Sequence, residues 1–174
     1  MRADVEREFV EYVTGRMPRL HRAAYLLCGD ATRADDIVQA TLVSLYAKWG
    51  RARGADNIEG YVHRILVRRF LDERRSAWAR VVLSDSLPER PDPAGTPVED
   101  RDAVVTALRG VPRGQRAVVV LRFLCDLSVE ETAEALGCST GNVKSQSARG
   151  LATLRELMGG VPVTAARVGK VEER

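Results

Sequence analysis

The stretch that decides the fold is SVEETAEALGCSTGNVKSQSARG, residues 128–150. Two helices that pack at a steep angle need a small residue where they cross, a turn residue that tolerates a left-handed backbone, and an apolar residue that returns to the core. Ala133, Gly137 and Val143 meet these three needs at the required spacing. Ser128 with Glu131 forms a capping-box pattern before the first helix. We therefore expect a helix-turn-helix, with helices over residues 129–136 and 140–158.

The second of these helices has the composition of a DNA-reading helix. Residues 140–155 contain three basic residues and no acid, whereas the acids of the motif lie on the first helix. Short hydroxyls, amides and cations suit base edges and phosphates in a major groove, and a plain helical hairpin would not need this acid-free composition. The expected DNA contacts are Ser139, Thr140, Asn142, Val143, Lys144, Gln146, Ser147 and Arg149.

A break in composition precedes this module. Residues 84–98 (SDSLPERPDPAGTPV) contain four prolines, and residues 84–102 carry six acids against two arginines. Such a segment sustains neither helix nor strand and is typical of a flexible linker. Between it and the motif we expect one helix that ends at Gly110 and another from Pro112 to Leu124.

Three helices are expected before the linker, over residues 4–27, 33–49 and 58–80. Pro18 should kink or break the first of them, and Asn57 should cap the third. In the second, Val38, Leu42, Leu45 and Trp49 recur at three- or four-residue spacing and form a buried stripe. No alternating strand pattern occurs, so the predicted fold is all-α, with two small helical domains.

The third helix and the loop before it are rich in arginine. Residues 51–80 carry eight arginines against four acids, and Arg64, Arg68 and Arg75 fall on one side of the helix. Phosphate binding is one use of such an array, and Trp78 with the loop arginines Arg51 and Arg53 could add contacts to a single strand. An ordinary solvated helix face is the alternative.

Composition excludes several other classes. The chain of 174 residues is 45% apolar, 29% charged and 5% aromatic, with a net charge of +3. Cys28, Cys125 and Cys138 are widely spaced and fit buried positions better than a metal site or a disulfide framework, although a redox role stays open. No catalytic triad, phosphate loop or cofactor motif appears, so we expect neither an enzyme nor a cofactor. No signal or membrane-spanning segment is apparent, and the expected location is the cytoplasm.

Residues 4–158 resemble the extracytoplasmic-function (group 4) sigma factors of bacterial RNA polymerase, in the sigma-70 superfamily. The matching stretches are residues 34–49 (ADDIVQATLVSLYAKW), 61–75 (YVHRILVRRFLDERR), 108–124 (LRGVPRGQRAVVVLRFL) and 127–154. The resemblance implies region 2 over residues 1–82, a linker over 83–98, region 4 over 99–158 and a tail over 159–174 that we expect to be disordered. It also implies promoter-specific initiation, with core RNA polymerase, promoter DNA and an anti-sigma factor as partners.

Site residues follow from the same resemblance. Contact with core polymerase is implied for Asp35, Asp36, Ile37, Gln39 and Thr41. The −10 element would be bound by Arg51, Arg53, Asn57, Arg64, Arg68, Arg69, Arg75 and Trp78, and the −35 element by the helix after Ser139. This sequence departs from the family pattern at Ala40, Arg68 and Gln146, where an acid, an asparagine and an arginine are frequent. The variants and the arginine- and alanine-rich composition point to an actinobacterial subgroup with a high-GC genome.

Rival classes are a free-standing dimeric regulator and a protein-only adaptor such as an anti-sigma factor. The first would need a sensor pocket or a dimerisation helix, and neither is clear in the sequence. The second has no use for an acid-free reading helix.

Overall fold

The computed structural model describes residues 3–81 and 103–159, with side chains placed as far as Asp72 in the first of these ranges. Every regular element in these two ranges is helical, as predicted, and none is a strand. The expected linker and almost all of the expected tail lie outside the described residues.

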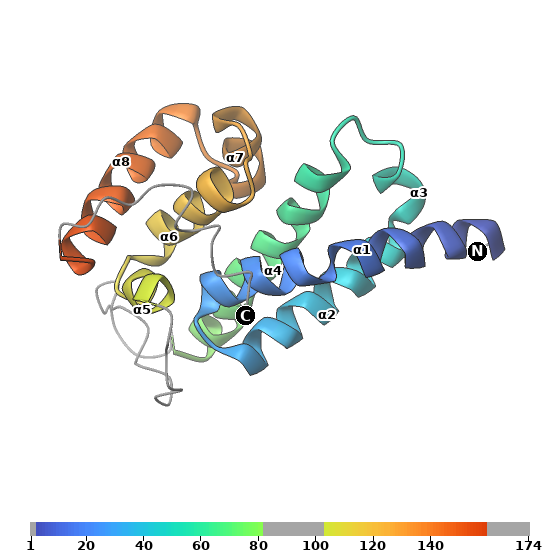
Figure 1. Ribbon diagram of the computed structural model, residues 1–174, viewed down its shortest axis with the longest axis horizontal. Helices are drawn as coiled ribbons and strands as arrows, with labels where there is room; N and C mark the ends of the chain where they lie inside the picture. The colour runs from blue at the N-terminus through green and yellow to red at the C-terminus, as the bar shows by residue number, and fades with distance from the viewer. Residues whose placement is uncertain (1–2, 82–102, 160–174) are drawn as a thin grey trace.

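The amino-terminal half consists of α1 (Ala3–Cys28), α2 (Ala31–Ala47), the short α3 (Trp49–Ala52) and α4 (Ile58–Val81). Of the two predicted effects of Pro18, a kink or a break, the break is wrong, because α1 continues through it. Pro18 cannot donate to the carbonyl of Thr14, but both residues are exposed, so water can satisfy that carbonyl. Figure 1 shows α1 and α2 side by side, with α4 behind them.

The carboxy-terminal half consists of α5 (Ala103–Arg109), α6 (Arg113–Val119), the π-helical turn η1 (Val120–Leu124), α7 (Val129–Leu136) and α8 (Thr140–Leu157). The helix expected from Pro112 to Leu124 is therefore present, but its last turn widens to a π-helix. The chain then reverses through Asp126, whose φ of 52° is left-handed.

Short polar side chains begin the helices where the sequence places them. Oδ1 of Asp30 accepts a 2.8 Å hydrogen bond from the backbone nitrogen of Arg33, and Oδ1 of Asn57 accepts one of 2.8 Å from that of Gly60. Each bond satisfies an amide that has no partner within its own helix. The predicted cap at Asn57 is confirmed, and the cap at Asp30 moves the start of α2 to Ala31.

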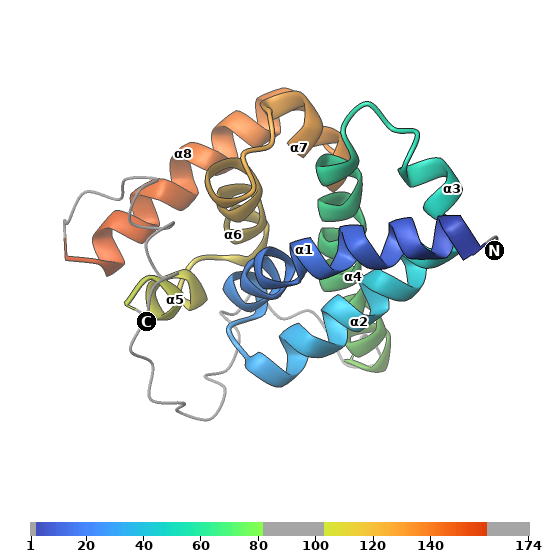
Figure 2. The same ribbon diagram turned by 45° about the vertical axis from the view of Figure 1, so that its right-hand side comes forward.

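The two halves share one apolar core. The predicted stripe of α2 is buried at Val38 and Leu45, Leu42 packs against it, and Trp49 of α3 completes it. The same core continues into the other half through residues such as Leu108 and Leu121. Figures 1 and 2 both place α6 and α7 against α1 and α4. Hydrophobic burial therefore holds the halves together, as well as stabilising each of them.

Three arginine side chains of the carboxy-terminal half donate hydrogen bonds to backbone carbonyls of the amino-terminal half. Arg116, with no exposed surface, donates hydrogen bonds to the carbonyls of Leu27 (2.7 Å), Arg109 (3.1 Å) and Val111 (3.1 Å). Arg109 bonds the carbonyl of Gly29. The guanidinium carbon of Arg113 lies 4.1 Å from the centre of the Phe70 ring, and its Nη2 donates to the Phe70 carbonyl at 3.0 Å.

Candidate nucleic-acid interface

The helix-turn-helix forms with the geometry that the sequence predicts. The hydroxyl of Ser128 accepts from the backbone nitrogen of Glu131 at 3.0 Å, and the Glu131 carboxylate accepts from that of Ser128 at 2.7 Å. Gly137 has φ 67°, the left-handed conformation expected at the turn. Ala133 and Val143 are buried together against Val118 of α6. These contacts fix the angle between α7 and α8.

A glycine allows α8 to lie close to α6. A Cβ atom added at Gly150 would fall 2.8 Å from Cγ2 of Val119 and 3.2 Å from the Gln115 carbonyl oxygen. No side chain fits at this crossing without displacing its neighbours. Because Gly150 has no side chain, one side of α8 packs closely on α6, and the opposite side faces solvent.

The expected −35 residues lie mainly on this solvent side. Ser139, Thr140, Asn142, Lys144 and Arg149 are exposed, and Gln146 and Ser147 are half-buried. Val143 is the exception. It has no exposed surface and belongs to the core, so in this structure it positions the helix and is not available to DNA. The exposed face of α8 carries no acid before Glu156.

Several of the residues expected to bind the −10 element form hydrogen bonds or ion pairs within the chain. Nη2 of Arg64 lies 2.5 Å from Oε1 of Glu134, and Nδ2 of Asn57 donates to Oε1 of Glu131 at 2.5 Å. Arg53 pairs with Glu8 at 2.8 Å, and Nε of Arg69 donates to the Ser44 hydroxyl at 3.1 Å. Arg51 and Arg68 are exposed. The side chains of Arg75 and Trp78 lie outside the described residues.

The expected polymerase-binding residues of α2 divide between surface and core. Asp35, Asp36 and Gln39 are exposed, and Asp35 lies 3.1 Å from Nδ1 of His21. Ile37 is only 4% exposed and Thr41 is fully buried, with its hydroxyl donating to the Ile37 carbonyl. These two residues therefore position α2 and do not belong to its contact surface in this structure.

Two exposed apolar side chains extend the same face of α2 and were not anticipated from the sequence. Val43 is 71% exposed and Tyr46 is 44% exposed. They follow Gln39 at helical spacing, which places them on the exposed side of α2 and not in the buried stripe. This spacing was the signal in the sequence that could have identified them. With Asp36 and Gln39 they form one polar and apolar strip, which we call the α2 strip.

The described residues contain no cluster of three or more histidines, cysteines or acids able to hold a metal ion. The three cysteines form no disulfide among the described residues. Cys28 is buried, as expected, whereas Cys125 and Cys138 are only half-buried. Burial, with nearby Asp126 and Glu59, raises the pKa of the Cys125 thiol to about 12. A thiol that is protonated at neutral pH reacts slowly, so the environment of Cys125 in this structure does not favour redox sensing.

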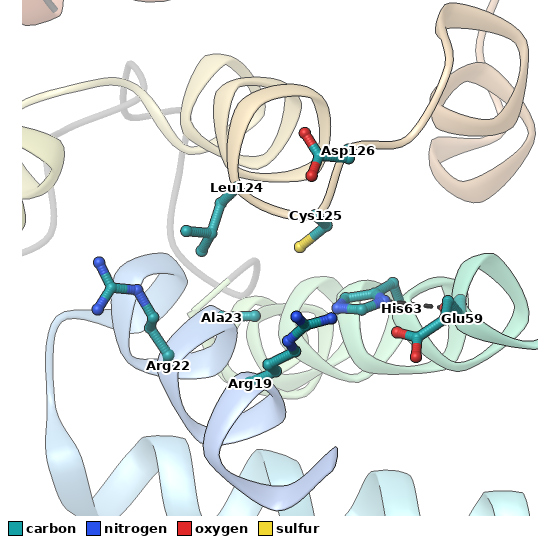
Figure 3. Close-up of a pocket in the computed structure, with 8 residues that line it drawn as sticks. All are labelled: Arg19, Arg22, Ala23, Glu59, His63, Leu124, Cys125 and Asp126. Carbon is teal, nitrogen blue, oxygen red and sulfur yellow. Dashed lines mark hydrogen bonds between the residues drawn. The ribbon is translucent and has the colours of Figure 1, made fainter. Parts of the chain in front are cut away.

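Cys125 lines a cavity of about 200 Å³ between the two halves. Figure 3 shows its sulfur pointing from the end of η1 toward α4, with His63 and Glu59 on the α4 side and Arg19 and Arg22 on α1. Nδ1 of His63 lies 2.8 Å from the Glu59 carbonyl, and burial lowers the pKa of His63. At this cavity the side chains of the two halves face each other but do not fill the space between them.

Two family models match this arrangement in chain order. The model of sigma-70 region 2 covers residues 13–80, and that of sigma-70 region 4 covers residues 101–154. The first contains the arginine-rich α4, and the second contains the helix-turn-helix. The chain belongs to the sigma-70 family. The chain is therefore a factor that directs promoter-specific transcription initiation, and not a ligand-responsive regulator.

Named relatives agree with this assignment. The RNA polymerase sigma-E factor of Streptomyces coelicolor is 37% identical over 150 residues, which cover 86% of this chain and 85% of that protein. The ECF RNA polymerase sigma factor SigM of Mycobacterium tuberculosis is 36% identical over 143 residues, covering 81% and 72%.

A solved structure shares the arrangement of both halves. It is the sigma factor RpoE of Bartonella quintana in complex with the anti-sigma factor NepR, with a TM-score of 0.72 and 26% identity. The match covers 89% of this chain and 99% of that one. Among residues 3–81 and 103–159, no helix is long and apolar enough to cross a membrane.

Proposed function

We propose that this sigma factor reads a −35 element with the exposed side of α8 and a −10 element with α4 and the loop before it. The observation that carries the proposal is the division of α8. One side is pressed onto α6 at Gly150, and the other presents Asn142, Lys144 and Arg149 without an acid among them. Amide and guanidinium groups can bond base edges, and the cations can bond phosphates.

The −10 role rests on the basic surface of the amino-terminal half. Arg51 and Arg68 are exposed, and Asn57 and Arg64 lie at the start of α4. Cations along one helix favour the phosphates of a strand, and an unstacked base offers its edge to an amide such as that of Asn57. Arg75 and Trp78, whose side chains lie outside the described residues, stay in the proposed −10 set.

The contact with core polymerase is assigned to the α2 strip. Val43 and Tyr46 supply apolar area, and Asp36 and Gln39 supply polar groups beside it. An interface core commonly combines apolar or aromatic side chains with a polar rim. Asp35 lies next to the strip and would take part at its edge.

The chain supplies no reaction chemistry in this scheme, because RNA synthesis belongs to the polymerase. Its contribution is sequence preference added to an enzyme that binds DNA largely through charge. An anti-sigma factor is a further proposed partner, since RpoE of Bartonella quintana was solved with one. We also retain, as proposals, region 2 over residues 1–82, region 4 over residues 99–158 and a cytoplasmic location.

Transcription in vitro tests this function. Core RNA polymerase from a Streptomyces species is mixed with fragmented genomic DNA, with and without the full chain, and transcript starts are sequenced. The expected result is a set of starts that require the chain and share two sequence elements upstream. The Lys144→Ala, Arg149→Ala double variant is tested in parallel with the unchanged chain. Most of the chain-dependent transcript starts should be lost with this variant. Starts that do not depend on the chain would contradict the proposal.

A further inference from the structure

We propose that the cavity lined by Cys125, between α1, α4 and the end of η1, binds the phosphate group of a small molecule. The inference goes beyond promoter reading and does not depend on it. None of the residues that line this cavity belongs to the proposed DNA or polymerase contacts. Charge, hydrogen-bonding capacity and size each favour such a ligand.

The first support is the pair of cations on α1. Arg19 and Arg22 both line the cavity, and Figure 3 shows them on its α1 side. Arg19 is exposed, and within the part of the chain that the structure describes it forms no hydrogen bond or ion pair. A guanidinium can bind two oxygens of one phosphate with parallel hydrogen bonds. Arg19 can therefore hold a phosphate group at the mouth of the cavity.

The second support is the orientation of His63, which is only 5% exposed. Its Nδ1 lies 2.8 Å from the Glu59 carbonyl oxygen, which can only accept, so Nδ1 carries the proton of the neutral ring. The other nitrogen, Nε2, forms no hydrogen bond with the described residues, and Figure 3 shows the ring extending toward Arg19. When the ring gains a second proton, Nε2 becomes a donor beside a guanidinium. An anion between these two donors stabilises that arrangement.

The two acids at the cavity do not prevent an anion from binding there. Glu59 forms an ion pair with Arg16, which compensates its charge. Asp126 is exposed, and Figure 3 shows it beyond Cys125, on the opposite side of the cavity from Arg19. Solvent therefore screens the charge of Asp126 from a phosphate bound at the α1 side.

The volume of the cavity fits a small ligand. It is about 200 Å³, whereas about 150 Å³ is enough to hold benzene. A phosphate group is smaller than that ring, so space remains beside it, and Ala23 and Leu124 form an apolar part of the lining. The chemistry that the site recognises is the phosphate group, whether it belongs to the free ion or to a small phosphate ester.

Binding should be linked to a proton on His63. Burial lowers the pKa of His63 and Arg19 lowers it further, whereas the contact with Glu59 opposes this shift. A bound dianion compensates the charge of Arg19 and raises the pKa of His63, so it should bind more tightly as the pH falls. The other titratable groups that line the cavity with His63 are Arg22 of α1 and the side chains of Cys125 and Asp126.

Proton NMR of the full chain tests the site, because His21 and His63 are its two histidines. Sulfate is the probe, since it has the shape of phosphate and does not titrate near neutral pH. Added at constant ionic strength, sulfate should move the imidazole signals of His63 saturably, with a dissociation constant of about 1 mM, and shift their titration to higher pH. The signals of His21 should not move. No response of His63, or an equal response of both histidines, would overturn the site.

Two variants separate the site from general charge attraction. Arg19→Gln and Arg7→Gln each remove one exposed arginine of α1, and only Arg19 lines the cavity. Arg19→Gln should weaken sulfate binding at His63 by at least about tenfold, and Arg7→Gln by less than about twofold. Without sulfate, Arg19→Gln should shift the His63 titration to higher pH, which shows that the variant keeps its fold at this position. Equal effects of the two variants on sulfate binding would overturn the proposal.

Inorganic phosphate, glycerol phosphate and acetate are then compared at one pH through the same His63 signals. Tighter binding of glycerol phosphate than of inorganic phosphate would assign the site to a small phosphate ester. Equal binding of the two would assign it to free phosphate. Acetate that binds as tightly as phosphate would show a site for any anion and overturn the phosphate assignment.

Discussion

Arg116 of α6 donates a 2.7 Å hydrogen bond to the carbonyl of Leu27, at the end of α1 in the other half of the molecule. The same guanidinium reaches the carbonyl of Arg109, at the end of α5. Two helix carboxyl ends, each with partial negative charge, thus converge on one buried cation. This arrangement explains how a fully buried arginine is held by carbonyl oxygens of the backbone.

Replacing Arg116 with methionine should destabilise the whole chain, because three carbonyls lose a donor in a region closed to water. We expect the free energy of unfolding in urea to fall by about 2–4 kcal/mol, since each buried unsatisfied acceptor costs about 1–3 kcal/mol. Arg155→Met is the control. Arg155 is exposed on α8, and its replacement should change stability by less than about 0.5 kcal/mol. Equal losses in the two variants would show that the carbonyl contacts of Arg116 do not matter.

The Lys144→Ala, Arg149→Ala double variant should weaken binding to the −35 duplex and leave binding to core polymerase intact. If both side chains contact phosphates, the slope of log affinity against log salt should decrease by about 2. Duplex affinity is measured by anisotropy at several salt concentrations, and holoenzyme assembly by gel filtration. Unchanged duplex binding would mean that the reading face is misassigned.

Val43→Ser should lower affinity for core polymerase without a loss of fold stability, because the side chain is 71% exposed in the free chain. We expect a weakening of about tenfold, corresponding to about 1–2 kcal/mol of apolar burial in the interface. Val10→Ser is the control, since Val10 is 54% exposed on α1, outside the α2 strip. The Asp35→Ala, Gln39→Ala double variant should weaken assembly as well. If the Val43→Ser chain and the Asp35→Ala, Gln39→Ala chain both assemble like the unchanged chain, the α2 strip is only a solvated face.

Acid should destabilise the chain through His63. Burial lowers the pKa of this histidine in the folded state, so the unfolded chain, whose histidine has a pKa near 6.5, binds the proton first. The stabilisation is therefore complete above about pH 6.5 and is lost as the pH falls toward the lower folded pKa. Urea unfolding at pH 7.5 and 5.5 measures this loss, and the free energy of unfolding should be lower at pH 5.5. His63→Gln should reduce the difference between the two pH values, and an unreduced difference would assign it to other groups.

The sequence was sufficient for the parts of the fold that local chemistry determines. Ser128, Gly137 and Asn57 define helix ends through bonds within four residues, so they are legible without tertiary information. The sequence could not decide between a kink and a break at Pro18, because a helix continues there only if water reaches the Thr14 carbonyl. Ile37, Thr41 and Val143 were placed in binding sets because a motif identifies a helix without resolving which of its sides is buried.

Contacts between the halves could not be predicted. Arg64 and Glu134 look like solvated charges on separate helices, and only their distance in space makes them partners. Arg116 gives no sequence signal of burial, since an arginine that follows a polar residue, Gln115, and precedes an apolar run is common on helix surfaces. Val43 and Tyr46 could have been found by extending the helical spacing of Gln39, but apolar residues on α2 are assigned to the core by default.

The Glu131 carboxylate uses one oxygen inside α7 and the other outside it. Oε2 accepts from the backbone of Ser128, and Oε1 accepts from Asn57 of α4. Loss of the second bond leaves the first in place, so α7 keeps its amino-terminal cap when α4 moves away. Separation of the halves can thus proceed as a rigid-body movement that does not require α7 to unwind.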